Sequence, residues 1–163
     1  MSGTPIPALH KAMNLLAARP LSEIELLNRL RRAGYSDPEA DAAIAECRKR
    51  RYLDDNQLTQ DGVTALRERN LGGRQIRLRL QRRGLDPEQI QAQLEQDPEA
   101  EFSAAVRAKA TKERLLKTEP DPRKKREKLF RFLAGRGFSS EVIFRVLDTA
   151  PPGESAGFTD EYQ

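Results

Sequence analysis

Three glycines stand in one recurring local pattern, which restricts the fold more than any other feature of this sequence. Gly34, Gly84 and Gly137 each follow a leucine by four residues and precede a large apolar residue and then Ser or Asp. Glycine tolerates the left-handed backbone that ends many helices, and Ser or Asp can cap the next helix. The glycines are 50 and 53 residues apart, enough for three helices per repeat. The pattern therefore predicts tandem helical repeats.

Five helix-start signals support this prediction. Each has an apolar residue before a Ser or Asp whose side chain can accept hydrogen bonds from the first helical turn. At four of them Glu or Gln follows three residues later, which completes a capping box, whereas Val142 follows the last cap. The five predicted caps are Ser22, Ser36, Asp54, Asp86 and Ser139.

The predicted fold class is all-α, with three tandem three-helix repeats in an elongated, curved array. The repeats are expected at 8–51, 54–96 and 99–149, between a flexible N-terminus at 1–7 and a disordered tail at 150–163. Apolar spacing and cap positions predict nine helices, at about 8–18, 23–33, 37–51, 56–69, 74–83, 87–96, 98–117, 123–134 and 140–149.

Composition limits the class of protein. Apolar residues make up 37% of the chain and charged residues 33%, which suits small helical units better than one thick core. The single cysteine, Cys47, lies on an apolar stripe, so we expect a buried thiol and no intramolecular disulfide. No apolar run approaches the roughly 20 residues that span a bilayer, and MSGTPIP is not a signal sequence. We therefore expect a cytoplasmic monomer without membrane contact.

The residue types argue against an enzyme. His10 is the only histidine, so no imidazole and thiol cluster has the spacing of a metal site. No glycine-rich phosphate loop follows a strand. Asp54 and Asp55 could bind a divalent metal, but their place at a helix start favours capping. We expect no cofactor and no catalytic residue.

Basic residues give the candidate binding sites. The net charge is +4 with a pI near 9.4, which is compatible with an acidic partner. On the helix after Gly73, Ile76 and Leu80 form one stripe, so three other residues project from the opposite side. The remaining candidates close the third helix or lie in the basic stretch 107–131, where a solvated face is the alternative explanation. The candidate partner-binding or nucleic-acid-binding residues are Arg74, Leu78, Arg82, Arg48, Lys49, Arg50, Arg51, Lys124, Lys125 and Arg126.

Three blocks of the sequence resemble one known family. YLDD followed by RERNLGGRQIRLRLQRRGL is similar to the central motif of RecX, the bacterial regulator of the RecA recombinase. RKKREKLFRFLAGRGFSSEVIFRVL resembles the C-terminal repeat of that family, and RPLSEIELLNRL with AGYS resembles its first repeat. The resemblance covers about residues 8–149. Asn70 and Gly73 depart from the glycine and proline that are common there, and both are turn positions.

The resemblance implies a protein without catalytic activity that binds the RecA–DNA filament and suppresses filament growth, ATP hydrolysis, strand exchange and LexA cleavage. Groove binding and capping of the filament end stay open as alternatives. The residues alone reach only a basic helical binding module, so a DNA-binding protein that competes for single- or double-stranded DNA is the alternative function.

Overall fold

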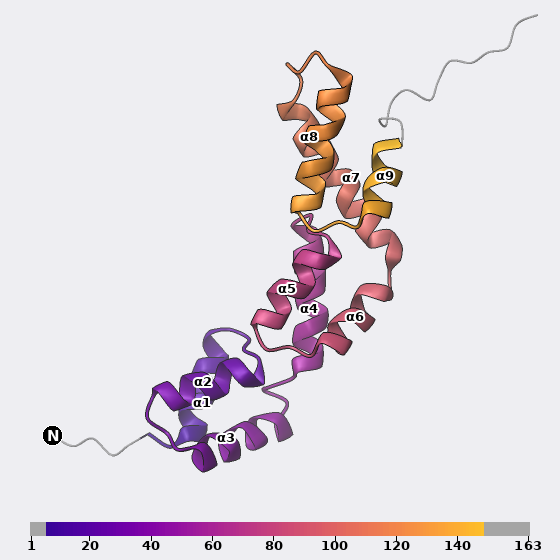
Figure 1. Cartoon of the computed structure of the whole chain (residues 1–163). Coiled ribbons are helices and arrows are strands. Elements are labelled where there is room, and N and C mark those ends of the chain that lie inside the picture. The colour runs from indigo at the N-terminus through magenta and orange to yellow at the C-terminus, as the bar shows by residue number, and fades with distance from the viewer. Residues whose placement is uncertain (1–5, 149–163) are drawn as a thin grey trace, which may run out of the picture. The chain divides into compact units, whose positions relative to one another are not determined.

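The computed structural model describes residues 6–148, and within this range every regular element is an α-helix (Figure 1). The all-α prediction is therefore confirmed for the described residues. The expected disordered tail at 150–163 lies outside them, as does most of the expected flexible N-terminus. The helices are α1 (Ala8–Ala18), α2 (Glu23–Arg32), α3 (Asp37–Lys49), α4 (Asp55–Glu68), α5 (Gly73–Arg82), α6 (Pro87–Glu95), α7 (Pro98–Leu115), α8 (Pro122–Gly135) and α9 (Ser140–Asp148).

The helices form two compact units. Unit 1 contains the residues up to 66 together with 76–97, and unit 2 contains 67–75 together with the residues from 98 onward. Helices α4 and α5 each contribute residues to both units. The boundaries of the three repeats, drawn from the sequence alone, stay a prediction.

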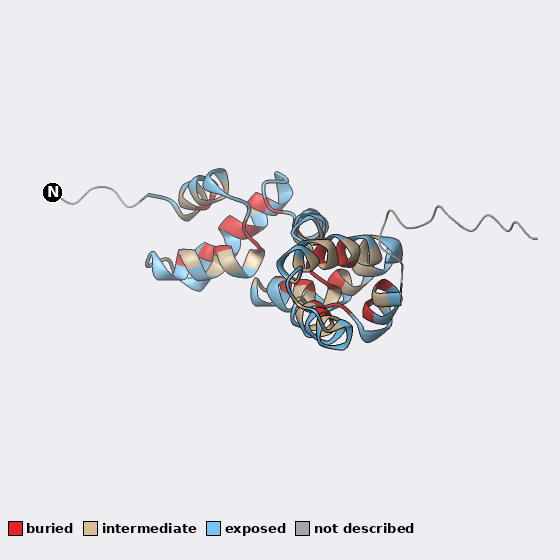
Figure 2. Ribbon diagram, turned by 90° about the horizontal axis from the view of Figure 1, so that it is seen from above, coloured by how far each residue is buried: buried red, intermediate tan, exposed pale blue. Residues whose placement is uncertain are grey.

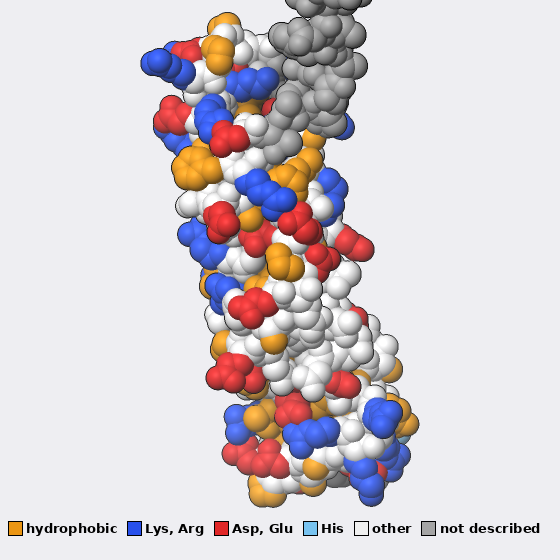
Figure 3. All heavy atoms as spheres, turned by 90° about the vertical axis from the view of Figure 1, so that its right-hand side faces the viewer, with side chains coloured by type: hydrophobic (Ala, Val, Ile, Leu, Met, Phe, Trp, Pro, Cys, Tyr) orange, Lys and Arg blue, Asp and Glu red, His pale blue; other side chains and the backbone are white. Residues whose placement is uncertain are grey.

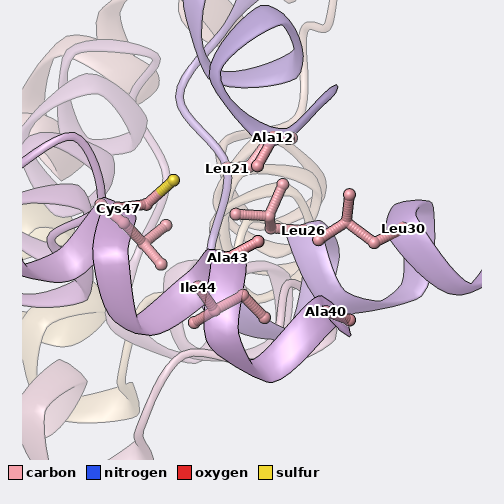
Figure 4. Close-up of a cluster of buried hydrophobic side chains, with 9 residues drawn as sticks. Ala12, Leu21, Leu26, Leu30, Ala40, Ala43, Ile44 and Cys47 are labelled. Carbon is pink, nitrogen blue, oxygen red and sulfur yellow. The ribbon is translucent and has the colours of Figure 1, made fainter. Parts of the chain in front are cut away.

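The core of the first three helices lies in unit 1. Small and branched side chains of α1, α2 and α3 pack together there, and Figure 4 shows them converging between the helices. Leu26 and Leu30 are fully buried on α2, whereas the periodicity predicted Leu27 and Leu30. Cys47 is also fully buried, and this burial raises the pKa of its thiol, as expected for a packing residue.

The core of the last three helices lies in unit 2. Ala104, Ala105 and Ala108 form the buried side of α7, and their small side chains allow α8 and α9 to approach closely. Leu133 and Ile143 are the buried side chains opposite them. Figure 2 shows that buried residues occupy only part of each helix, so both cores are thin, as the polar composition predicts.

The three repeated glycines end their helices in the same way. Gly34, Gly84 and Gly137 have φ angles of +94°, +80° and +89°. After each glycine, the next amide donates to the carbonyl of the leucine that precedes the glycine by four residues, at 3.2–3.3 Å. The glycine amide donates to the carbonyl three residues before it. These two bonds define a Schellman motif, so the predicted equivalence of the three turns is confirmed.

The predicted caps also form. Ser22 and Ser36 take part in capping boxes with Glu25 and Glu39. Asp54 accepts from the Gln57 amide at 3.0 Å. The side chains of Asp86 and Ser139 accept from first-turn amides of α6 and α9.

In unit 1 the turn at Gly84 is fastened to the start of α2 by Arg83, and we call this contact the Arg83 junction. The Arg83 guanidinium donates to the Pro20 carbonyl at 3.1 Å and to both carboxylate oxygens of Glu25 at 2.9 and 3.2 Å. The Ser22 hydroxyl donates to the Arg83 carbonyl. Asp55, on the following helix, accepts from the first amide of α2 at 3.1 Å. A helix start thus serves as the docking point for a later turn.

Unit 2 contains an equivalent contact, the Arg136 junction. Arg136 donates to the Asn70 carbonyl at 2.7 Å and to the Arg69 carbonyl, directly before α5. The Gly72 amide donates to the Arg136 carbonyl at 2.9 Å. Glu101 accepts from the Gly73 amide at 3.3 Å. An arginine, a glycine turn and a carboxylate therefore meet a helix start in both junctions.

Replacing these glycines separates backbone strain from docking. At Gly34 an added Cβ meets nothing within 4 Å, so Gly34→Ala should cost only left-handed strain, about 1–2 kcal/mol. At Gly137 it would lie 2.5 Å from the Gln75 backbone nitrogen. Gly137→Ala should therefore cost roughly 1–3 kcal/mol more, because the junction must shift. Urea denaturation of both variants, followed by circular dichroism, measures the difference. Equal losses would show that the turn at Gly137 is not docked.

The Arg83 junction also predicts a pH dependence. Burial raises the pKa of Glu25, but the hydrogen bonds from Arg83 and Ser22 and the charges of Arg83 and Arg19 outweigh it, so the pKa is lowered. The stability from this carboxylate is therefore present above its usual value of 4.5 and is lost as pH falls through the lower folded value. The stability advantage of the native chain over Glu25→Gln should shrink in that window.

Asp55 provides a control of opposite sign for this experiment. Burial is the main cause that raises the pKa of Asp55 above its usual 3.8, although the Glu23 amide bond opposes it. Folding therefore favours the protonated form, and the native chain should gain stability relative to Asp55→Asn as pH falls through the raised pKa towards 3.8. Denaturation at a series of pH values measures both differences. Parallel pH profiles for the two variants would contradict the assignment.

Candidate partner-binding surfaces

The outward side of α5 carries the first candidate residues. Ile76 and Leu80 are buried on this helix, whereas Leu78 is 41% exposed and Arg82 is exposed, as the periodicity predicts. Within the described residues the Arg82 side chain makes no hydrogen bond or ion pair. Leu78 and Arg82 are thus available to a partner.

Arg74 differs from Arg82 because it contacts the end of α8. Its guanidinium donates to the Ala134 carbonyl at 2.9 Å, and its amide donates to the Gly137 carbonyl at 3.1 Å. The periodicity placed Arg74 on the outward side of α5, but a carbonyl of another helix already holds its side chain. Arg74 is therefore part of the Arg136 junction, although its exposed surface can still meet a partner.

The basic residues that close α3 fall into two groups. Arg48 forms a two-point pair with Glu23, with both N–O distances at 2.7 Å, and Arg50 pairs with Glu46 at 2.6 Å. The side chains of Lys49 and Arg51 are exposed and form no hydrogen bond or ion pair within the described residues. Arg51 has a φ of +58° and continues the chain towards α4. These two residues remain the free cations of this segment.

Unit 1 contains a polar pocket beside these residues, with a volume of about 630 Å³. Arg48 and Arg51 contribute cations to its lining, and acids at the starts of α2, α4 and α6 contribute opposite charge. The pocket can receive polar or charged side chains of a partner. Its lining is Glu23, Arg48, Arg51, Leu53, Asp54, Asp55, Asn56, Gly84, Asp86 and Gln89.

A smaller apolar pocket lies against α1. Met13, Leu16, Ala17 and Tyr52 line about 270 Å³, and Tyr52 is 52% exposed. Such a pocket can accept an apolar side chain. The periodicity assigned Met13 and Leu16 to the core, but they also face this pocket.

The candidate residues of α8 do not form one set. Arg126 donates to the Leu147 carbonyl at 3.3 Å and pairs with Asp148 at 2.8 Å, so it satisfies acceptors at the end of α9. The Lys124 and Lys125 side chains form no such bond within the described residues. Figure 3 shows acidic and basic side chains interspersed on the face that it presents.

Residues with metal-binding chemistry are not assembled within the described part of the chain. No group of three or more His, Cys, Asp and Glu there could hold a metal ion. Asp54 and Asp55 accept from backbone amides, as capping predicts. Among helices in residues 6–148, none is long and apolar enough to cross a membrane.

The junction residues were not among the predicted sites. Arg83 and Arg136 directly precede two of the three aligned glycines, whereas Ala33 precedes the first. Aligning the repeats on their glycines therefore contained a signal for these two arginines. The carboxylates of Asp55 and Glu101 had no comparable signal, because each lies at a different place in its helix.

Comparison with known proteins gives a consistent result. The family model described as the first three-helix domain of RecX matches residues 8–47, and that of the third three-helix domain matches residues 102–147. The regulatory protein RecX of Legionella pneumophila (strain Corby) is 31% identical over 140 residues, covering 85% of this chain and 91% of that protein. The regulatory protein RecX of Chlorobaculum tepidum is 31% identical over 150 residues, covering 91% of both.

Solved structures show the same fold. The crystal structure of RecX from Lactobacillus salivarius superposes with a TM-score of 0.78 at 19% identity, covering 86% of this chain and 92% of that one. A second crystal structure of regulatory protein RecX gives a TM-score of 0.75 at 20% identity, covering 91% of this chain and 81% of that one.

The two arginines of α5 should differ in their effect on stability. Arg74→Ala removes the hydrogen bond to the Ala134 carbonyl, so we expect a loss of about 0.5–1.5 kcal/mol. Arg82→Ala removes no bond and should change the free energy of unfolding by less than about 0.5 kcal/mol. Thermal denaturation of the two single variants measures both effects. An Arg82 variant that melts at the lower temperature would reverse the assignment.

Proposed function

Because the chain belongs to the RecX family, we propose that it is a negative regulator of the RecA recombinase that binds the RecA–DNA filament. It binds in the helical groove of the filament or at its end, and inhibits filament extension, ATP hydrolysis, strand exchange and LexA cleavage. The observation that carries the proposal is identity of 31% to a regulatory protein RecX across 85% of this chain and 91% of the relative. The protein acts as a cytoplasmic monomer without catalysis of its own, within DNA repair, recombination and the SOS response.

The distribution of free side chains supports regulation through contact. Leu78 and Arg82 present an apolar residue and a cation one turn apart on α5. Arginine pairs with carboxylates or phosphates through a planar fork, and an exposed leucine beside it can be desolvated by a partner. Lys49 and Arg51 offer further cations. Several modest contacts on one chain add up to tight binding when they engage a repeating partner together.

Unpaired cations also favour a second candidate function. Lys49, Lys124 and Lys125 can contact phosphates directly, so the protein could compete with RecA for DNA. The two functions differ in the amount of protein that inhibition requires. Binding to the filament inhibits at concentrations too low to coat the DNA, whereas competition requires DNA saturation.

The test is the ATPase activity of RecA on single-stranded DNA, titrated with the native chain and with Leu78→Ser/Arg82→Ala. Inhibition by the native chain should appear well below DNA saturation. The double variant should need at least tenfold more protein, equivalent to about 1.4 kcal/mol of binding. Arg79→Ala is the matched control, because Arg79 is an exposed arginine of the same helix on a different side.

Each alternative outcome has a defined meaning. Inhibition that begins only when the DNA is saturated would replace filament binding by competition. Full inhibition by a normally folded Leu78/Arg82 variant would remove the outward side of α5 from the binding surface. No inhibition by the native chain at any concentration would reject the proposed function.

A further inference from the structure

The hairpin of α7 and α8 is longer than its counterparts in the chain. Helix α8 begins 15 residues before Gly137, whereas α2 and α5 begin 11 residues before Gly34 and Gly84. The four additional residues form one more helical turn, 122–125. Helix α7 has 18 residues, against 14 in α4 and 11 in α1. Both arms of this hairpin are therefore extended at the end where residues 116–121 connect them (Figure 1).

The additional turn does not contribute to a core. Its residues are Pro122, Arg123, Lys124 and Lys125, and none of them is buried. On the other arm Leu115 is 72% exposed. Burial of apolar surface stabilises a helix packed in a protein, and this extension buries almost none. Packing therefore does not account for the additional turn.

Five cations gather at this end of the hairpin, and we call them the hairpin-end cluster: Arg114, Lys117, Arg123, Lys124 and Lys125. Within residues 6–148, none of their side chains makes a hydrogen bond or an ion pair. The two nearest acids have other partners. Glu119 pairs with Lys128, and Asp121 accepts from the first amides of α8. The cluster is therefore a concentration of charge without internal neutralisation.

The placement of these cations is unfavourable for the fold itself. The start of a helix carries partial positive charge, and each cation in the first turn costs about 0.3–1 kcal/mol. Six other helices have acids in the first turn, including α2, α3 and α7, whereas α8 has none. Residues that lower stability and bury nothing are typical of a binding element.

From these observations we propose that the hairpin-end cluster contacts the phosphodiester backbone of DNA. Arg123, Lys124 and Lys125 follow one another at 100° steps around α8, so they project to three sides of the helix. Cations on several sides of a narrow hairpin end match a groove with phosphates along both walls better than a flat acidic protein surface. Arg126, suggested by the sequence, is excluded from the cluster because it holds the end of α9.

The proposal rests on the proposed function only in that DNA is part of the filament, so it can be tested without RecA. The probes are a short fluorescently labelled DNA duplex and a single strand of the same sequence, with binding measured by anisotropy over a series of salt concentrations. The variant is Arg123→Gln/Lys124→Gln/Lys125→Gln. The matched control, Arg32→Gln/Arg69→Gln/Arg79→Gln, removes the same charge from exposed arginines elsewhere.

For the duplex, each lost phosphate contact should reduce the slope of log K against log salt by about 0.9, and by about 0.7 for the single strand. We expect a clear reduction for the hairpin-end variant and little change for the control. Its helix content and melting temperature should equal or exceed those of the native chain, because the unfavourable cations are removed. The larger of the two slope reductions identifies which form of DNA the cluster contacts.

Two results would overturn the inference. Equal reductions for the variant and the control would mean that DNA senses only the total charge. An unchanged slope together with weaker inhibition of RecA would mean that the cluster contacts protein. Failure of the proposed function has a different signature, since the native chain would then leave RecA active while the DNA slopes still separate the variants.

Discussion

The left-handed turn at each repeated glycine is the constraint on which the rest of the structure depends. At Gly84 and Gly137 this turn reverses the chain so that the preceding arginine faces the start of an earlier helix. The arginine then satisfies carbonyls that precede this helix, while its own carbonyl accepts a hydrogen bond in return. Because backbone groups provide most acceptors, these contacts tolerate sequence change except at the glycine and the arginine.

The junctions also decide which basic residues are free for a partner. The chain has 29 lysines and arginines, and charge alone cannot rank them. Arg83 and Arg136 are committed to junctions, and Arg126 to the end of α9. Arg82 and Lys124 resemble them in sequence context but have no internal partner. The binding surface therefore consists of the cations that the fold does not use.

Local patterns made much of the fold predictable from the sequence. The Schellman turns and helix caps are set by residues within six positions of one another, so their signals at Gly34 or Ser22 could be found without a structure. The roles of Arg74 and Arg126 could not, because their acceptors, such as the Ala134 carbonyl, lie on helices distant in the sequence. Helical periodicity gives the direction of a side chain but not what it meets.

Ala33 stands where Arg83 and Arg136 stand in the other two turns, and its methyl group cannot donate a hydrogen bond. At the opposite position, the residue that corresponds to Ser22 and Gly72 is Lys125, which lies inside α8 instead of before a helix start. A turn of one molecule therefore finds no complementary helix start on α8 of another. Head-to-tail interfaces that do not close generate fibres, and these two substitutions act against such polymerisation. The same chemistry that joins segments within the chain is thus prevented from joining one copy to the next.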